Sequence, residues 1–143
     1  MKIAQLIAHR ARGDVIACTA DMRVADVIAL LAEKRIGALP VVENGRVAGI
    51  FSERDVVYRL AAEGAACLER PVGEVMTAPA ITVEPEIQVL EALGLMTRRR
   101  IRHLPVVDGD TMCGFISIGD LVKSRIDEIA QEAEAMRSYI MTA

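Results

Sequence analysis

Two short segments of the chain carry the side chains best suited to chemistry. They are Ser52-Glu53-Arg54-Asp55 and Ser117-Ile118-Gly119-Asp120, and both have the form Ser-x-x-Asp. Each follows an apolar run and opens a helix-forming stretch, which predicts a strand-to-helix turn. The free N–H groups and positive dipole end at such a turn suit a phosphate, and the serine hydroxyl adds one donor. An aspartate one turn later can accept from both hydroxyls of a ribose. The pattern therefore favours a phosphorylated nucleoside.

The same pattern also has a purely structural interpretation. A serine N-cap followed three residues later by an acidic side chain resembles a capping box, which needs no ligand. Arg54 occurs only in the first copy, where it either clamps a phosphate or lies solvated on the helix surface. Gly119 takes its place in the second copy and leaves room for close approach of a ligand to the backbone.

These segments belong to an internal repeat. A shift of 65 positions superimposes them, and the match runs without gaps from about residue 16 to residue 57. Identical pairs include Pro40 with Pro105 and Gly49 with Gly114. The chain is therefore predicted to use one structural unit twice.

Local patterns predict a βαββα unit in each copy. An extended piece, 15–18 or 80–83, precedes an amphipathic helix that ends in basic residues. Two strands then flank a tight turn, at Asn44-Gly45 in the first copy and at Asp108-Gly109-Asp110 in the second, where we expect a slightly different loop. A long helix from about Asp120 to about Ile140 closes the chain, and its apolar stripe lies either on the module or on another subunit.

Composition limits the classes of function. The 143 residues, 52% of them hydrophobic, suit one integrated α/β module of two tandem domains, 1–70 and 71–143. A net charge of −3 and 3% aromatic residues argue against nucleic acid as a partner. No apolar stretch approaches the ~20 residues needed to cross a membrane, and no secretory signal is recognised, so a cytoplasmic protein is expected. The three cysteines lack the spacing of a metal or redox site and are expected to be reduced core residues.

The ordered set of motifs resembles the tandem cystathionine-β-synthase (CBS) domains of a Bateman module. The resemblance covers nearly the whole chain. Its carriers are 34–42 with 49–55, then Val75-Met76-Thr77, then 100–107 with 114–120. It implies two domains related by a pseudo-twofold axis and joined through their sheets, with two clefts that hold adenosine derivatives such as AMP, ADP or ATP, or NAD or S-adenosylmethionine.

The resemblance also implies a set of site residues. In the first cleft, Ser52 and Asp55 would do the polar work. In the second, Ser117 and Asp120 would face phosphate and ribose. The base would lie against two groups of residues: Ile16, Ala17, Gly37, Ala38 and Leu39 in the first cleft, and Ile81, Thr82 and the backbone near Arg102, His103 and Leu104 in the second. Arg54 is a further candidate for the phosphate.

The sequence thus predicts a regulatory adenine-nucleotide sensor that acts on a separate protein, and the resemblance implies a homodimer. A scaffold that binds no nucleotide is the alternative, and a nucleotide-processing enzyme is a weaker one, because the chain shows no activated nucleophile, metal set or Walker-type loop. His103 is interpreted as a cleft wall, since the only other histidine is His9, far away in the sequence.

Overall fold

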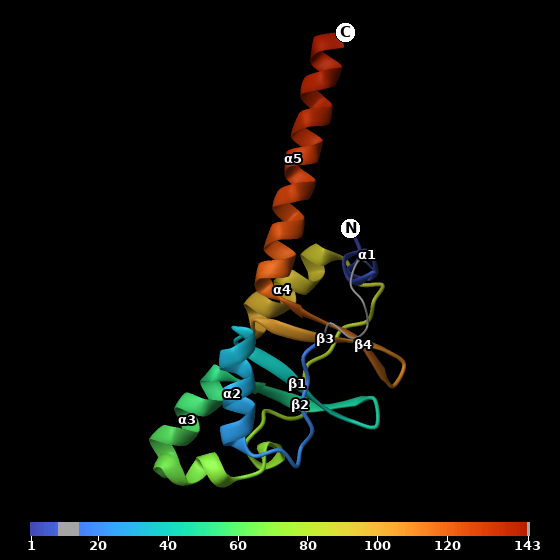
Figure 1. Ribbon diagram of the computed structural model, residues 1–143. Helices are drawn as coiled ribbons and strands as arrows, with labels where there is room; N and C mark the ends of the chain where they lie inside the picture. Colours follow the sequence, from blue (N-terminus) through green and yellow to red (C-terminus); the bar gives the residue numbers. More distant parts are fainter. Residues whose placement is uncertain (9–14, 143) are drawn as a thin grey trace.

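The computed structural model describes residues 1–8 and 15–142 and contains two copies of one mixed α/β unit (Figure 1). The elements of the first copy are α2 (Val24–Lys34), β1 (Ala38–Glu43), β2 (Arg46–Ser52) and α3 (Glu53–Glu63). Those of the second are α4 (Val89–Arg99), β3 (His103–Asp108), β4 (Thr111–Ser117) and α5 (Ile118–Thr142). The remaining elements are α1 (Ile3–Ile7), η2 (Gly64–Glu69) and η3 (Val72–Glu74). The predicted α/β class and its duplication are confirmed.

Each copy contains an antiparallel hairpin with a two-residue turn. The first turn holds Asn44 and Gly45 at φ of 53° and 78°, the pair of positive values that the Asn-Gly sequence predicts. In the second turn Gly109 has φ 63°, and Asp108 pairs directly with Thr111. The two loops therefore have equal length but are built on different residues.

The extended pieces before α2 and α4 each join their hairpin at a single parallel bridge. The amide of Cys18 donates to the carbonyl of Pro40 at 3.1 Å, and Val83 donates to Pro105 at 3.0 Å. Prolines fit these positions because a proline carbonyl can still accept although its nitrogen cannot donate. The predicted extended pieces are thus single-bridge segments rather than full strands.

The connecting segment that precedes each copy packs on the other copy. Residues 71–77, which follow the first copy, lie against its hairpin, where Ile50 and Thr77 exchange backbone hydrogen bonds of 3.0 and 2.8 Å. Residues 1–7 pack instead against the second copy, where Ile3 donates to the carbonyl of Ile87 at 2.9 Å. The packed units therefore differ from the sequential halves 1–70 and 71–143, because each unit takes its covering segment from outside its own repeat.

The two buried cores follow this exchange. One surrounds Leu39, Val41 and Phe51 and includes Val72 and Val75 of the linker. The other surrounds Leu104, Val106 and Ile116 and includes Ile3 of the N-terminal segment. Each hairpin therefore has an apolar core of its own, while β2 and β4 contact one another between the copies.

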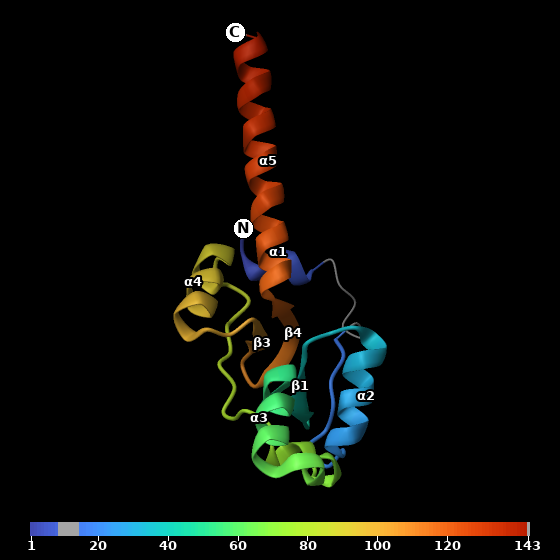
Figure 2. The same ribbon diagram turned by 90° about the vertical axis from the view of Figure 1, so that its left-hand side faces the viewer.

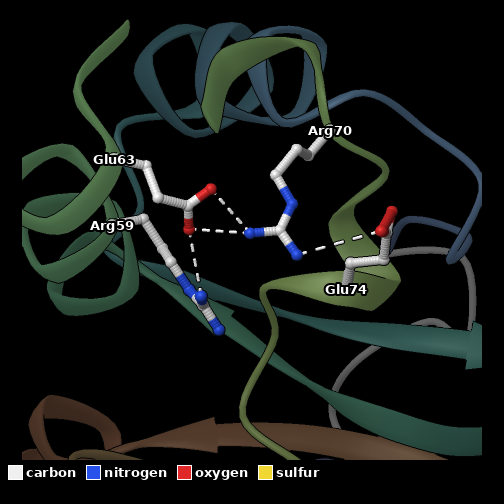
Figure 3. Close-up of polar contacts among 4 residues, drawn as sticks. All are labelled: Arg59, Glu63, Arg70 and Glu74. Carbon is white, nitrogen blue, oxygen red and sulfur yellow. Dashed lines mark hydrogen bonds and ion pairs between the residues drawn. The ribbon is translucent and has the colours of Figure 1, made fainter. Parts of the chain in front are cut away.

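An ion-pair cluster holds the end of α3 to the linker (Figure 3). The carboxylate of Glu63 accepts from Arg70 at 2.7 Å and from Arg59 at 3.0 Å. Hydrogen bonding from Arg70 is the main cause that lowers the pKa of Glu63, and the same bond raises the pKa of Arg70. Arg70 also reaches Glu74 at 3.8 Å. The cluster ties α3 to the chain that leads into residues 71–77.

Helix α5 extends well beyond the body of the module in both views (Figures 1 and 2). It runs for 25 residues, two residues further at each end than the sequence predicts. Only its first part is packed on the module, where Leu121 and Ser124 are buried.

Gly49 offers a test of the exchanged linker. A Cβ at Gly49 would lie 2.7 Å from both the sulfur of Met76 and the backbone oxygen of Thr77, whereas at Gly114 the nearest atom is a side-chain carbon of Ile7 at 3.0 Å. We expect Gly49→Ala to lower the free energy of unfolding by about 1–3 kcal/mol. Gly114→Ala should cost clearly less, because a side-chain tip can move more readily than a hydrogen-bonded backbone. Urea denaturation measures both, and equal losses would contradict the close backbone packing at Gly49.

Candidate functional site

A pocket of about 390 Å³ lies between the two copies. Its size falls in the range of small-molecule sites, which is roughly 300–1,000 Å³. The first copy contributes Val15, Ile16, Arg35, Ile36, Gly37 and Ala38, and the second contributes His103, Phe115, Ser117 and Asp120. The pocket thus combines the apolar wall of one repeat with the Ser-x-x-Asp segment of the other.

The first wall is formed where α2 ends and the chain turns into β1. Arg35 adopts the left-handed conformation at φ 54°, and its amide donates back to Ala32 at 3.3 Å. This turn ends the helix and directs residues 36–38 along the pocket toward the hairpin. The opposite wall is formed where β4 ends at Ser117 and α5 begins.

Ser117 and Asp120 cap the start of α5 reciprocally. The amide of Asp120 donates to the Ser117 hydroxyl at 3.1 Å, and the amide of Ser117 donates to the Asp120 carboxylate at 2.9 Å. The amide of Ile118 donates to the carbonyl of Arg102 at 2.8 Å. The capping interpretation is therefore confirmed for this segment, although both of its polar side chains also line the pocket.

Because of this capping, fewer backbone amides at the start of α5 can donate to a phosphate than the sequence predicts. Among the first four amides of α5, those of Ser117, Ile118 and Asp120 already have partners. Within the described part of the chain, Gly119 is left as the amide at this helix start for which no partner is found. The prediction of several free N–H groups is wrong, because the cap uses two of them and the carbonyl of Arg102 a third. Arg35 is a cation in the wall of the same pocket.

Ser52 and Asp55 form the equivalent cap of α3, and Asp55 also bonds to the linker. The Asp55 carboxylate accepts from the Ser52 amide at 2.9 Å, from the Ser52 hydroxyl at 3.1 Å and from the Thr77 hydroxyl at 2.8 Å. Both of its oxygens therefore have donors within the protein. Thr77 belongs to the linker, so this aspartate also fastens the exchanged segment.

Arg54 lies across the boundary between the two copies. Its guanidinium donates to the backbone carbonyl of Arg100 at 3.3 Å. Arg100 is the repeat counterpart of Arg35, so Arg54 approaches the position that would form the wall of a second, symmetry-related cleft. The side chain is exposed, as the solvated alternative expects, and it also tethers the two repeats.

The structure regroups the residues predicted for the site. Six of them line the pocket together: Ile16, Gly37, Ala38, His103, Ser117 and Asp120. Nine others do not: Ala17, Leu39, Ser52, Arg54, Asp55, Ile81, Thr82, Arg102 and Leu104. In this pocket the predicted wall of Ile16, Gly37 and Ala38 faces Ser117 and Asp120 of the other copy, not Ser52 and Asp55 of its own repeat. Leu39 and Leu104 are both 0% exposed in the cores.

Comparison with known proteins identifies this architecture. The family model for the CBS domain matches the chain twice, over residues 7–62 and 72–127. The chain belongs to the CBS domain family. Its arrangement of two packed repeats is therefore a CBS pair.

Similar proteins extend along most of the CBS pair. The "CBS domain-containing protein CBSX3, mitochondrial" of Arabidopsis thaliana is 38% identical over 135 residues, which are 91% of this chain and 66% of the relative. The chain thus spans just under two thirds of that protein. A solved protein with CBS domains from Burkholderia ambifaria is 41% identical, with a TM-score of 0.81 over 89% of this chain and 95% of its own. CBSX2, solved in complex with AMP, shares the fold at 23% identity and a TM-score of 0.75, with 88% and 96% covered.

Four pocket residues of the CBS pair were missed by the sequence analysis. Val15 and Phe115 were predicted only as parts of an extended piece and a strand, Ile36 was given no role in the site, and Arg35 was interpreted as one of several cations at a helix end. Arg35 had one available signal: it is the last residue of a basic helix end immediately before the predicted Gly37-Ala38 wall. Position in the repeat, rather than residue type, would have identified it.

His103 stands in the pocket wall, as the sequence predicts. Its ring stacks on Phe115 with the centroids 5.5 Å apart and the planes 11° from parallel. Burial is the main cause that lowers the pKa of His103; Arg102 lowers it further, while Asp120 and Glu53 act in the opposite direction. The pocket therefore favours a neutral imidazole.

The remaining expectations concern membranes, metals and thiols. In residues 1–8 and 15–142 no helix is both long and apolar enough to cross a membrane. The same residues contain no group of three or more His, Cys, Asp or Glu side chains suited to a metal ion. Cys18 and Cys67 are buried, as expected, whereas Cys113 is only half-buried, and no disulfide joins any of the three within the described residues. Burial raises the pKa of Cys18 to about 11. His9 lies outside the described residues.

The lowered pKa of His103 predicts a dependence of stability on pH. Between that lowered value and about 6.5, the unfolded chain binds more protons than the folded one, so the free energy of unfolding should fall as the pH falls through this window. His103→Gln should remove this part of the loss. Urea denaturation of both proteins between about pH 7.5 and 5.5 measures it, and His9 is common to both. Parallel curves for the two proteins would show that His103 titrates normally.

Proposed function

We propose that this CBS pair binds an adenosine phosphate, AMP, ADP or ATP, in the pocket between its repeats and reports that ligand to a separate protein. The observation that carries the proposal is the composition of the pocket, where an apolar wall that also holds the cation Arg35 faces a serine and an aspartate of the other repeat. Residues of these types, placed in this way, match the base, sugar and phosphate of one nucleotide. Proteins of the same fold, such as CBSX2, have been solved with AMP.

Each part of the ligand has a candidate partner. The base would lie against Ile16, Gly37 and Ala38, and NAD or S-adenosylmethionine would present the same adenosine part. The Asp120 carboxylate would accept from the ribose hydroxyls. The Ser117 hydroxyl and the amide of Gly119 would donate to the phosphate, and the Arg35 guanidinium would offset its charge. Asp120 thereby combines a capping role with a ligand role.

Regulation follows from the position of the ligand between the copies. A nucleotide that contacts both repeats stabilises the packing in which the two walls face one another, so it shifts the population toward that arrangement. The coupling requires a difference in affinity between two states of the module. In this proposal the protein is a homodimeric sensor rather than an enzyme, and the partner that responds is a separate chain. Its cytoplasmic location stays a prediction, since the Arabidopsis relative is named as mitochondrial.

A scaffold function is the second candidate, and one observation favours it. Both Ser-x-x-Asp segments are complete capping boxes without any ligand. If capping is their whole role, both aspartates contribute to stability alone. The two candidates therefore differ in what the loss of Asp120 does.

Paired aspartate variants separate these candidates. Asp120→Ala and Asp55→Ala should each cost about 0.5–2 kcal/mol in free energy of unfolding, because each removes a cap. Only Asp120→Ala should also weaken binding of the adenosine phosphate, by roughly 10-fold or more, since Asp120 lines the pocket and Asp55 does not. Isothermal titration with AMP, ADP and ATP measures affinity, after a thermal-shift screen has ranked them.

Each outcome of the aspartate experiment decides one point. Equal affinity for the two variants would remove Asp120 from the ribose site. Absence of any thermal shift with the wild-type protein, freed of co-purified nucleotide, would leave the scaffold function.

Arg54 leads to a prediction about stoichiometry. Because its side chain spans the boundary at the second, symmetry-related position, we expect one nucleotide per chain in the wild-type protein. Arg54→Ala should raise the stoichiometry toward two, with little change in affinity at the Asp120 pocket. Arg59→Ala is the control, since Arg59 lies on the same helix but pairs with Glu63. Two equivalent nucleotide sites in the wild-type protein would show that Arg54 does not block the second position.

A further inference from the structure

The outward face of α5 carries an apolar stripe that the module leaves uncovered. The stripe, here called the outer stripe, consists of Val122, Ile126, Ile129, Ala133, Met136 and Ile140. Successive members are alternately four and three residues apart. Ile126, Ile129 and Met136 are 59%, 48% and 60% exposed, which is unusual for side chains of this size.

The outer stripe is distinct from the face that packs on the module. Leu121 and Ser124 are the buried residues of α5. At 3.6 residues per turn, the outer stripe lies roughly 130° around the helix from them. From residue 129 to residue 142 every side chain is exposed. The module therefore supports only the first part of the helix.

This arrangement presents a physical difficulty that a partner would resolve. Helical segments of about 12–15 residues are marginal in water when nothing packs against them. Alternating spacings of three and four are the pattern of a helix whose seam is buried against another helix in a left-handed coiled coil. Single apolar residues scattered over a surface need no explanation, but a continuous apolar stripe is typical of an interaction site.

We propose that a second copy of this chain covers the outer stripe, and that the two α5 helices form a parallel coiled coil about a twofold axis. Ile126, Ala133 and Ile140 then occupy the a positions of the heptad, and Val122, Ile129 and Met136 occupy the d positions. An identical stripe on each chain is self-complementary, as a twofold interface requires. The two modules lie at the same end of the pair.

Charge selects the parallel arrangement. In this register Glu132 is at a g position and Arg137 is at the following e position, which places opposite charges side by side across a parallel pair. An antiparallel pair centred near residue 131 brings Glu132 against its own copy and Lys123 near Arg137, which are like charges. In the single chain Arg137 reaches Glu134 at 3.5 Å with both side chains exposed, so this local contact is easily exchanged.

Substitution within the outer stripe tests the interface. We expect the wild-type protein to be a dimer by analytical ultracentrifugation at micromolar concentration, and Ile129→Glu to raise the dissociation constant by about 100-fold or more. Met141→Glu is the matched control, because Met141 is on the same helix and 79% exposed but lies outside the stripe. Both substituted side chains are exposed in the single chain, Ile129 to 48% and Met141 to 79%, so both variants should still unfold cooperatively in urea. A monomeric wild type, or a dimer that survives Ile129→Glu, overturns the proposal.

Cross-linking and charge exchange test the orientation. In a parallel pair the two copies of residue 136 face each other, so Met136→Cys should form an intermolecular disulfide on mild oxidation, whereas Ser138→Cys on the outer surface should not. The wild type, which has Cys113 half-buried, reports the background. Arg137→Glu should weaken the dimer, and the double variant with Glu132→Arg should restore it. Failure of both the cross-link and the rescue overturns the parallel arrangement. This inference rests on the homodimer of the proposed function and specifies its interface; because nucleotide binding is not used as a readout, its failure is distinguishable from failure of the nucleotide site.

Discussion

The exchange of covering segments is the constraint on which the rest of the structure depends. Each hairpin has one face that must be buried, and part of this cover comes from a connecting segment rather than from the repeat itself. Residues 71–77 close the first core with Val72 and Val75, and residues 1–7 close the second with Ile3. The hydrogen bonds match position for position: Val72 donates to Met22 at 2.7 Å, and Ile3 donates to Ile87 at 2.9 Å. Because each core needs chain from outside its own repeat, the two copies form one cooperative unit.

That unit creates the pocket. Once β2 and β4 lie together, the end of α2 in one copy faces the start of α5 in the other. The wall and the polar cap of the site therefore come from different repeats. A ligand held there contacts both copies, which couples its binding to their relative packing. The pocket and the proposed mechanism of sensing thus have the same structural origin.

Small sequence differences between the copies make the two Ser-x-x-Asp segments unequal. Arg54 in the first copy reaches the carbonyl of Arg100, whereas the equivalent position in the second copy is Gly119, which has no side chain to cross the boundary. Asp55 is bonded to Thr77 of the linker as well as to Ser52. The first Ser-x-x-Asp segment therefore helps to hold the linker in place. The second lines the pocket between the copies.

The local parts of this protein could be determined from sequence alone. The positive φ of Asn44 and Gly45, the caps at Ser52 and Ser117 and the amphipathic helices follow from residue type and near neighbours, because such preferences act within a few residues. The repeat and the family motifs extended these local assignments to the α/β class and to a nucleotide as the expected ligand.

Only the tertiary structure decided which local parts meet. The pairing of Gly37 and Ala38 with Asp120, the packing of Ile3 on the second copy and the reach of Arg54 to Arg100 join residues far apart in the chain. An internal repeat makes such pairings ambiguous, since each wall has two equivalent caps to choose from. The choice is made when the apolar face of each hairpin is buried. That burial depends on the packing of the whole chain rather than on any one segment.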